Sequence, residues 1–525
     1  MSDRVDAVIV GSGAAGSLMA ARLAEAGKRV LILEAGPARG TQDLVSNGLW
    51  GRRLKWGGAP VLETGAQPVG HNFNTGWGTG GAAVHHYGVW PRLHPEDFNE
   101  ASTHQRHLDW PIAYTDLQPW YDTVQSEVGV SGDHAQEVWR PAGAPYPQAP
   151  VPVFPHGEVI RRGFTALGRQ TSPIPIALHT ATAGDRKACI WDGWCDAGCP
   201  IGALANPLVT YLPRALAAGA VLKNGAEVAE ILQDTSGSRA TGVAWIDASG
   251  ARHSTEASVV IVAASTVQNA RLLLASRGRS PRGIGNASDQ LGRYVTIHLA
   301  CPVFGLWDED TQPHMGATGG QLLNQDGYAK VREDGPFGSY QWLIAQAMKP
   351  NDLLGVAMSR VDLYGPALDA FMKRAVRGFA MMTGVVEDAP LADNRVTLDG
   401  KTDARGLSLA TVNHSSSDAS LALWNHARDE GIAVLNAGGA KEVWAGNIGP
   451  MHNMGGTIMG KDPAASVTDG FGTLHGVGNL FVAGSSLFPT SGAVNPTFTV
   501  HALAARSAAH LIDNWRQIAG SVHAA

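Results

Sequence analysis

The pattern of apolar and polar residues predicts a strand, a helix and a second strand at the start of the chain. Residues 5–10 form a short apolar, β-branched run that is typical of a buried strand. Residues 17–26 are mostly small and favour a helix, and a second apolar run at 29–33 ends on Glu34. The turn after the first strand reads Gly11-Ser12-Gly13-Ala14-Ala15-Gly16. This order of strand, glycine turn, helix, strand and acid predicts a dinucleotide-binding unit.

The residue types in this unit fit the contacts that a dinucleotide needs. Gly11 allows the tight turn, Gly13 lets the backbone approach a pyrophosphate, and Gly16 lets helix and strand pack closely. The phosphates are expected at the helix N-terminus, where free N–H groups and the helix dipole favour anions. Glu34 is expected to accept hydrogen bonds from the ribose hydroxyls. The predicted contacts here are Gly11, Gly13, Ala14, Ala15, Gly16 and Glu34.

Later runs predict a return to the same sheet and a second domain. Strands are expected at 226–232, 241–246, 257–264 and 479–483, with a hairpin turn at 247–250 and helices at 157–167, 267–276 and 496–515. Residues 301–444 lack a nucleotide signal, and this segment is the candidate substrate domain. There, alternating apolar residues at 338–347, 354–363 and 377–386 predict an antiparallel sheet, followed by a helix at 415–431.

Composition narrows the functional class. Glycine contributes 64 of the 525 residues, and it is dense in the segment 51–84, where it predicts an irregular loop lying along an extended cofactor. The formal net charge of −6, with no basic cluster, argues against a nucleic-acid partner or an anionic membrane surface. No apolar run is long enough to span a bilayer. The first residues show no signal-peptide pattern, which taken alone predicts a cytoplasmic protein.

Two stretches near the end of the chain resemble a known family. Residues 478–497, which close on Val494-Asn495-Pro496-Thr497, are similar to the final motif of the glucose–methanol–choline (GMC) oxidoreductases, and residues 452–460 are similar to that family's histidine motif. The N-terminal unit fits as well, whereas Arg277 stands where the family often has glycine. The resemblance implies FAD as cofactor and oxidation of an alcohol by hydride transfer to flavin N5.

The resemblance also implies which residues perform the reaction. His452 matches the catalytic histidine and Asn495 its partner that holds the substrate oxygen. The hydroxyl proton must leave when hydride leaves the carbinol carbon, and histidine suits that role near neutral pH. Each residue alone has a plainer interpretation, a buried histidine and a helix cap, but both motifs occur in family order. The remaining expected FAD contacts are Gly80, Gly81, His85, Ala264, Gly484, Ser485, Asn495, Pro496 and Thr497.

The predicted fold class is therefore α/β: a Rossmann-like FAD-binding domain with a second, α+β substrate domain built on an antiparallel sheet. The FAD-binding domain is expected to comprise residues 1–95, 190–300 and 445–525. Residues 96–189 and 301–444 are expected to form the substrate domain and its connections.

Three of the four cysteines lie close together in the chain. Cys189, Cys195 and Cys199 fall within eleven residues, and a proline follows the last, as in iron–sulfur runs. A zinc site or three unrelated buried thiols are the alternatives. The bacterial sugar dehydrogenases of the GMC family resemble this spacing, which implies a [3Fe–4S] cluster in the loop 188–203. Cys301 is remote, either a small core residue or a fourth ligand of a [4Fe–4S] cluster.

This branch of the family implies partners and a compartment. Its members are exported beside a small subunit with a twin-arginine signal and are tethered by a multihaem cytochrome c. The chain is therefore expected on the periplasmic side of the inner membrane, reaching the membrane only through partners.

The leading hypothesis is an FAD-dependent dehydrogenase that oxidises a sugar, glycoside or polyol and passes electrons through the cluster to a cytochrome or quinone. An oxygen-reducing oxidase with structural cysteines and a non-redox lyase of the same fold are the alternatives.

Overall fold

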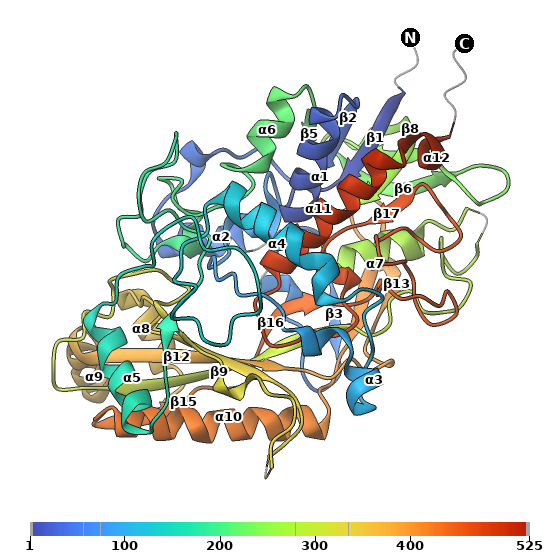
Figure 1. Cartoon of the computed structure of the whole chain (residues 1–525). Helices are drawn as coiled ribbons and strands as arrows, with labels where there is room; N and C mark the ends of the chain where they lie inside the picture. The colour runs from blue at the N-terminus through green and yellow to red at the C-terminus, as the bar shows by residue number, and fades with distance from the viewer. Residues whose placement is uncertain (1–3, 56, 74, 279, 334, 521–525) are drawn as a thin grey trace.

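Two seven-stranded sheets organise the chain (Figure 1). The computed structural model describes residues 4–55, 57–73, 75–278, 280–333 and 335–520. In the first sheet the strand order is β5-β2-β1-β8-β7-β6, and β17 also pairs with β8. Its strands are β1 (Val5–Val10), β2 (Val30–Glu34), β5 (Val221–Asn224), β6 (Glu227–Gln233), β7 (Ala240–Ile246), β8 (Arg252–Val262) and β17 (Leu480–Val482). The pairings among β5, β2, β1, β8 and β17 are parallel, as expected for a nucleotide-binding sheet.

Strand β8 serves two parts of this sheet. Its residues 257–262 lie parallel to β1, and its residues 252–256 pair antiparallel with β7. The predicted hairpin and its return to the nucleotide sheet are therefore confirmed.

Helix α1 (Ala14–Glu25) covers this sheet at close range. It packs against α11 (Thr497–Asp513) and α6 (Tyr211–Ala217), and α11 packs in turn against α4 (Tyr114–Val128). A Cβ atom on Gly16 would lie 2.2 Å from the carbonyl oxygen of Gly11, so only glycine permits this approach of helix and turn. The role predicted for Gly16 is confirmed.

The second sheet is antiparallel and has the order β15-β9-β12-β11-β10-β4, with β16 also on β9. Its strands are β4 (Ser172–Pro173), β9 (Thr296–Leu306), β10 (Leu322–Asn324), β11 (Tyr340–Ile344), β12 (Phe379–Glu387), β15 (Glu442–Ala445) and β16 (Gly449–Met454). Helix α10 (Asp418–Ala437) lies along one face together with α5 (Pro155–Ala166), and every residue of β12 is buried (Figure 1). The predicted antiparallel sheet is thus present.

One predicted strand of this sheet is wrong. Residues 354–363 begin inside a helix, α8 (Pro350–Ala357), which α9 (Gly365–Gly378) follows. The helix begins at Pro350, whose fixed φ suits the first helical position, and the Asp352 carboxylate accepts the N–H of Lys349 at 2.9 Å. These start signals outweigh the alternation of apolar residues.

A third, three-stranded sheet joins distant segments. It consists of β13 (Arg395–Thr402), β14 (Ser408–Asn413) and β3 (Leu62–Thr64). Strand β3 lies in the glycine-rich segment that the sequence predicts as irregular, and helix α2 (Gly48–Leu54) overlaps its start. Among the described residues, no helix combines the length and the apolarity that crossing a membrane requires.

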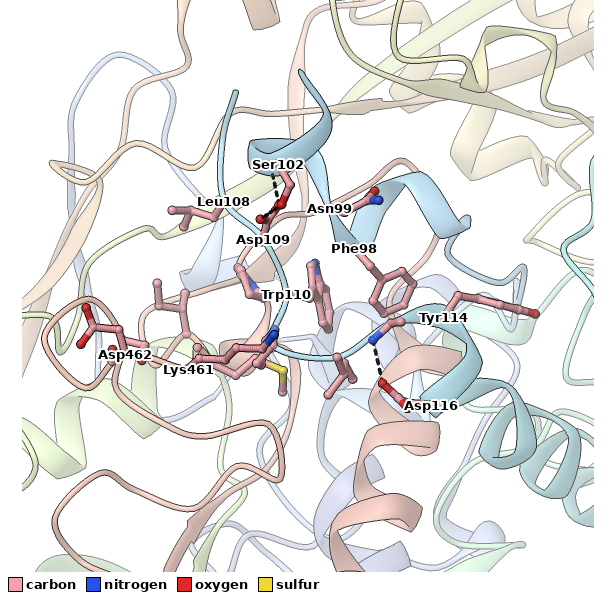
Figure 2. A pocket seen from close by; sticks show the side chains of 18 of the residues that line it. Phe98, Asn99, Ser102, Leu108, Asp109, Trp110, Tyr114, Asp116, Lys461 and Asp462 are labelled. Atoms are coloured by element: carbon pink, nitrogen blue, oxygen red, sulfur yellow. Dashed lines mark hydrogen bonds between the residues drawn. The ribbon is translucent and has the colours of Figure 1, made fainter. Parts of the chain in front are cut away.

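A groove of about 750 Å³ opens beside the segment 95–116 (Figure 2). Phe98, Trp110 and Met459 contribute to its apolar lining, and Lys461 and Asp462 lie at one end. Trp110 donates a hydrogen bond through Nε1 to Thr490 at 2.8 Å. Neither His452 nor Asn495 lines the groove, so it is separate from the predicted catalytic pair.

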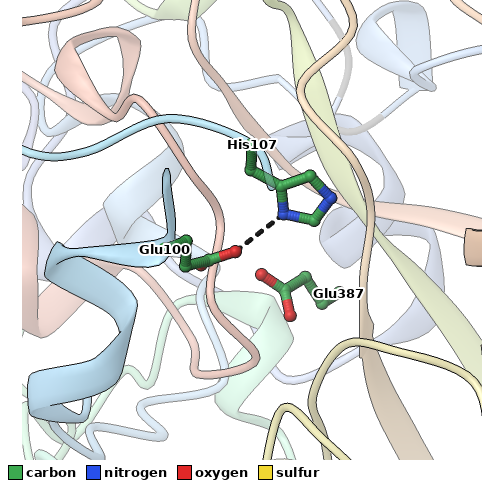
Figure 3. Close-up of side chains that lie close together, drawn as sticks. All are labelled: Glu100, His107 and Glu387. Atoms are coloured by element: carbon green, nitrogen blue, oxygen red, sulfur yellow. Dashed lines mark hydrogen bonds and ion pairs between the residues drawn. The ribbon is translucent and has the colours of Figure 1, made fainter. Parts of the chain in front are cut away.

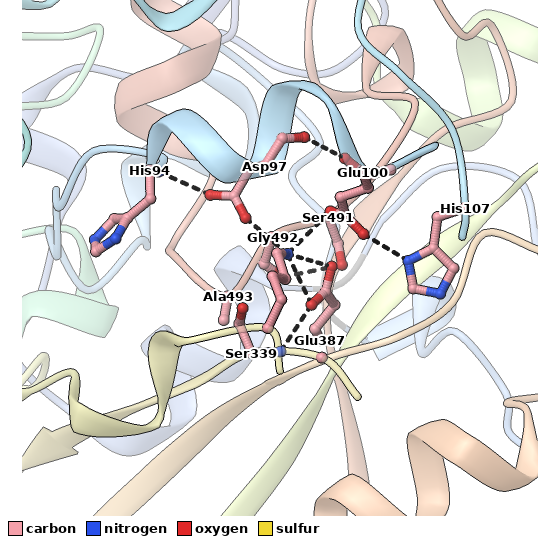
Figure 4. Close-up of polar contacts among 12 residues, drawn as sticks. His94, Asp97, Glu100, His107, Ser339, Glu387, Ser491, Gly492 and Ala493 are labelled. Carbon is pink, nitrogen blue, oxygen red and sulfur yellow. Dashed lines mark hydrogen bonds and ion pairs between the residues drawn. The ribbon is translucent and has the colours of Figure 1, made fainter. Parts of the chain in front are cut away.

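A cluster of buried charges supports the loop that leads to Asn495 (Figures 3 and 4). The Nζ atom of Lys330 lies 2.8 Å from Asp97 and 2.9 Å from both Glu100 and Glu387, and all four side chains are almost completely buried. His107 pairs with Glu100 at 2.7 Å. Glu100, His107 and Glu387 also have the geometry of a metal site, but the ammonium group of Lys330 already supplies the central positive charge.

The cluster reaches the loop through Tyr328. The tyrosine hydroxyl donates to Asp97 at 2.7 Å and accepts the N–H of Ala493 at 3.2 Å, two residues before Asn495. Burial alone would lower the pKa of Lys330, but the three carboxylates outweigh it and raise that pKa well above its usual value. The lysine therefore stays charged, and the cluster holds the loop in place.

We predict that Lys330→Met destabilises the protein by about 3–5 kcal/mol, because it leaves buried carboxylates without their counter-charge. Without the ammonium group these carboxylates bind protons more tightly in the folded than in the unfolded state, so the loss is larger at pH 8 than at pH 5. Urea unfolding at the two pH values measures the effect. Lys373→Met, at an exposed Lys373–Asp369 pair, is the control and should change stability by less than about 1 kcal/mol. Equal stability of Lys330→Met and the native protein would contradict this account.

Candidate functional site

The carboxylate of Glu34, at the end of β2, accepts hydrogen bonds from the glycine turn after β1 and from Gly36. It is buried and accepts hydrogen bonds from the Ser12 N–H at 3.1 Å, the Ser12 hydroxyl at 2.7 Å and the Gly36 N–H at 2.9 Å. The Ser12 oxygen accepts the N–H of Gly80 at 3.0 Å. The acid thus shapes the turn that would receive a dinucleotide, a role that the motif alone does not reveal.

A narrow cleft of about 80 Å³ lies along this turn. The predicted contacts Gly11, Gly13, Glu34, Gly81 and Ala264 line it. A Cβ atom on Gly13 would find its nearest neighbour 3.9 Å away, so this backbone presents an open face. The first N–H groups of α1, from Ala14 to Gly16, have no partner within the helix and are oriented for an anion. The donor set therefore fits the pyrophosphate of FAD.

His85 offers a second observation in favour of the cofactor. It caps the short helix η3 (Gly81–Val84), which Gly80 precedes with a φ of 89°. Its Nε2 atom is buried and has no hydrogen-bond partner among the described residues, and burial lowers its pKa to about 3. The Nε2 atom of His86, by contrast, lies 2.6 Å from the carbonyl oxygen of Ala205. Of these two histidines, His85 is the one with a free atom for a ligand.

His452 and Asn495 come from distant parts of the chain and meet. His452 lies on β16 of the antiparallel sheet, and Asn495 stands just before Pro496, the N-cap of α11. The Nδ2 atom of Asn495 is 3.2 Å from Nε2 of His452. The side chain of Asn495 is buried, and that of His452 is partly buried. The remaining predicted contact of this turn, Thr497, begins the helix.

An irregularity in β16 aims His452 toward Asn495. The pairing of β16 with β9 shifts register between Met451 and Met454, and His452 adopts a φ of 53°, which is uncommon for a residue other than glycine. The carbonyl oxygen of Asn453 accepts hydrogen bonds from the hydroxyls of Thr266 (2.7 Å) and Ser485 (2.8 Å). Ser485, a predicted FAD contact that follows Gly484, therefore helps to hold the bulge in position. Strain of this kind is concentrated at functional sites.

Two further residues touch the pair, and the sequence gives no signal for either. His298 on β9 places Nδ1 2.9 Å from Nδ1 of His452, and Gln341 on β11 donates to the amide oxygen of Asn495 at 3.2 Å. Burial lowers the pKa of His298 to about 4. Burial, and then the proximity of His298, lowers the pKa of His452 well below its usual value. Both imidazoles are therefore neutral near pH 7.

The three neighbouring cysteines share one apolar cluster. Cys189, Cys195 and Cys199 pack there with Met451, the residue before His452. Backbone N–H groups donate to two of the sulfur atoms, to Cys189 at 3.3 Å and to Cys199 at 3.4 Å. Burial raises the pKa of all three thiols, to about 12 for Cys189 and Cys195, so only a bound cation would deprotonate them near pH 7.

A cation stands beside these thiols. Arg186 donates to the carbonyl oxygens of Val128, Ala203 (2.7 Å) and Gly202 (3.3 Å), and it forms no ion pair with a carboxylate in the part of the chain described. Burial lowers its pKa to about 10, and the nearby Cys199 opposes that shift. A set of thiols with N–H donors and an unpaired guanidinium suits a negatively charged metal–thiolate group. Cys301 lies elsewhere, buried in β9.

Comparison with known proteins agrees with this geometry. A family model described as "GMC oxidoreductase" matches residues 5–300, and a second model of the same description matches residues 390–504. The 2-methyl-1,2-propanediol dehydrogenase of Mycolicibacterium austroafricanum is 30% identical, over 96% of this chain and 95% of its own. Paromamine 6'-oxidase of Streptomyces fradiae is also 30% identical, over 96% and 91%.

Two more proteins are similar to this chain over almost its whole length. The fructose dehydrogenase large subunit of Gluconobacter japonicus is 26% identical over 98% of both chains. The crystal structure of pyridoxine 4-oxidase from Mesorbium loti superposes with a TM-score of 0.68 at 16% identity, over 96% of this chain and 98% of that one, which confirms the fold. The two family models together match well over half of the residues of this chain. The chain therefore belongs to the GMC oxidoreductases and is an FAD-dependent oxidoreductase.

Proposed function

We propose that this protein is an FAD-dependent dehydrogenase that oxidises a hydroxyl group of a sugar, glycoside or polyol. The observation that carries the proposal is the contact between His452, a neutral side chain on β16, and Asn495, which precedes α11. FAD, when bound, accepts hydride from the carbinol carbon. The names of three relatives specify a diol, fructose and paromamine, which supports the substrate class.

The side chains have distinct roles in this reaction. The Nε2 atom of His452 takes the proton of the substrate hydroxyl, since a neutral imidazole is a competent base. The Nδ2 group of Asn495 donates a hydrogen bond to the substrate oxygen. The N-terminus of α11, with Pro496 and Thr497, favours negative charge beside it. Gly11, Gly13, Glu34 and the free Nε2 of His85 hold the cofactor.

We predict that His452→Ala retains FAD but slows anaerobic flavin reduction by roughly 10²–10⁴-fold, which is the usual contribution of a positioned base. Stopped-flow absorbance at the flavin band measures the rate, and the absorbance of the purified variant measures FAD content. His510→Ala, at a partly exposed histidine near the far end of α11, is the control and should reduce flavin at the native rate. A native rate in His452→Ala would remove this residue from the mechanism.

The cysteines extend the proposal to the electron acceptor. We propose that Cys189, Cys195 and Cys199 bind a [3Fe–4S] cluster, which supplies one-electron transfer. The thiols share an apolar cluster with Met451, the residue before His452, which supports a position close to the proposed reaction site. The N–H groups directed at sulfur and the unpaired Arg186 support a thiolate-bound group over three unrelated thiols.

Iron content tests the cluster directly. We predict that the anaerobically purified protein contains about three iron atoms per chain and gives a low-temperature EPR signal. Cys195→Ser should lose both while substrate still reduces the flavin. Cys301→Ser, at a cysteine outside the cluster, should keep both. Native protein without iron, or equal iron in Cys195→Ser, would leave the cysteines structural.

The acceptor distinguishes the remaining alternatives. A dehydrogenase should reduce ferricyanide rapidly under air and release little hydrogen peroxide, whereas an oxidase should release peroxide in proportion to substrate. A lyase of this fold would leave the flavin oxidised when substrate is added anaerobically. Comparing these three readings on one preparation decides between the functions.

The cluster also suggests partners and a compartment. We propose a small subunit with a twin-arginine signal, a multihaem cytochrome c as acceptor, and a position on the periplasmic side of the inner membrane. The fructose dehydrogenase relative is itself named a large subunit, which supports an assembly with smaller chains. Recovery of the native protein only from the washed cytosolic fraction would contradict this location.

A further inference from the structure

We infer that His298 is a positioning residue that fixes the tautomer of His452, with the proton on Nδ1 and the lone pair on Nε2. The inference rests on the proposed role of His452 as the base. It follows from a chain of hydrogen bonds in which each partner's role determines the next. His298 touches neither substrate nor cofactor in this account, and it acts only through His452.

The chain starts at a carbonyl group. The Nε2 atom of His298 lies 2.9 Å from the carbonyl oxygen of Gly492, which can only accept, so Nε2 carries a proton. A neutral imidazole has one N–H, which leaves Nδ1 of His298 as an acceptor. That atom lies 2.9 Å from Nδ1 of His452. Two acceptors do not attract, so the proton between the rings belongs to His452 Nδ1.

The opposite side of His452 leads to the same assignment. Gln341 donates through Nε2 to the amide oxygen of Asn495 at 3.2 Å, and Gln325 donates to the amide oxygen of Gln341 at 2.9 Å. Asn495 therefore directs its NH₂ group, a donor, at Nε2 of His452. A donor there requires an acceptor, which is the unprotonated ring nitrogen. The hydrogen bonds through His298 and those through Asn495 are independent, and both assign the proton of His452 to Nδ1.

The setting of His298 is rigid enough for this role. Its side chain is fully buried in β9, opposite Met451 of β16, and its ring meets that of His452 nearly edge-on, with centroids 5.1 Å apart and planes at 86°. Gly492, which receives its other hydrogen bond, belongs to the loop that the Tyr328–Asp97 contact secures (Figure 4). Neither ring can turn without losing a hydrogen bond.

The consequence for the proposed reaction is that the hydroxyl proton of the substrate goes to Nε2 of His452. When His452 takes the hydroxyl proton on Nε2, its Nδ1–H still donates to His298, which shares the new positive charge through that bond. No proton needs to pass to His298, because its acceptor atom keeps its lone pair. If His452 held its proton on Nε2 instead, it would present a donor to the substrate hydroxyl and would not act as a base.

Two substitutions of His298 distinguish its hydrogen bonds to His452 and Gly492 from the volume that its side chain fills. Glutamine carries an amide oxygen and an NH₂ group that can accept from His452 and donate to Gly492, whereas leucine can do neither. We predict that His298→Leu lowers the rate of flavin reduction at saturating substrate by about 10²-fold with little change in the half-saturating substrate concentration. His298→Gln should stay within about threefold of the native rate. His156→Leu, at another fully buried histidine, should match the native rate.

The tautomer has a readout that does not depend on catalysis. In protein labelled with [¹⁵N]histidine, the two nitrogens of His452, assigned by their absence in His452→Ala, should show a protonated Nδ1 and a bare Nε2. His298→Leu should shift this population toward protonated Nε2, and His298→Gln should preserve it. A native protein with Nε2 protonated, or an unchanged tautomer and rate in His298→Leu, would overturn the inference. Native flavin reduction in His452→Ala would instead refute the proposed base, and the spectrum would still decide the tautomer.

Discussion

The contact between His452 and Asn495 joins the antiparallel sheet to the loop that precedes α11, and much of the surrounding structure serves to keep it in place. One partner stands on a distorted strand of the antiparallel sheet, and the other precedes the helix that packs on the nucleotide sheet. Hydroxyls of Thr266 and Ser485 hold the strand side, and Tyr328 holds the loop side. A shift of either sheet relative to the other would change this distance first.

Neutral side chains surround His452 and Asn495 directly, and charged side chains lie farther away. The side chains that touch the pair, His298 and Gln341, are neutral, so no fixed charge lies directly against His452 or Asn495. The charges lie one layer behind, where the ammonium group of Lys330 lies within 2.9 Å of three carboxylates. Buried charges of this kind contribute rigidity only while each has its partner, since an unpaired buried charge is strongly unfavourable.

Sequence reasoning found what is encoded locally and could not find what depends on distant contacts. The glycine turn and the closing motif carry their meaning in adjacent residues, so Gly11, Gly16, His452 and Asn495 were accessible from the chain alone. His298 lies 154 residues from His452, and Lys330 lies 230 residues from Glu100, so no pattern along the chain joins them.

Two other outcomes have different causes. The strand predicted at 354–363 failed because a proline and a helix-capping carboxylate override a weak alternation. The role of Glu34 in binding Ser12 and Gly36 was hidden, because the motif predicts a ligand for the carboxylate and not the protein groups that also need it. The domain bounds, the catalytic roles of His452 and Asn495, the FAD contacts and the iron–sulfur ligands stay predictions.

The bulge in β16 makes the length of this strand as important as its composition. Side chains of a strand alternate between faces, so loss or gain of a single residue there would turn Met451 or Asn453 toward Asn495 and send the imidazole to the other face. Substitutions that preserve the residue count leave the geometry intact. Natural or engineered variation around this histidine should therefore consist of exchanges, and insertions or deletions should be confined to the loops on either side.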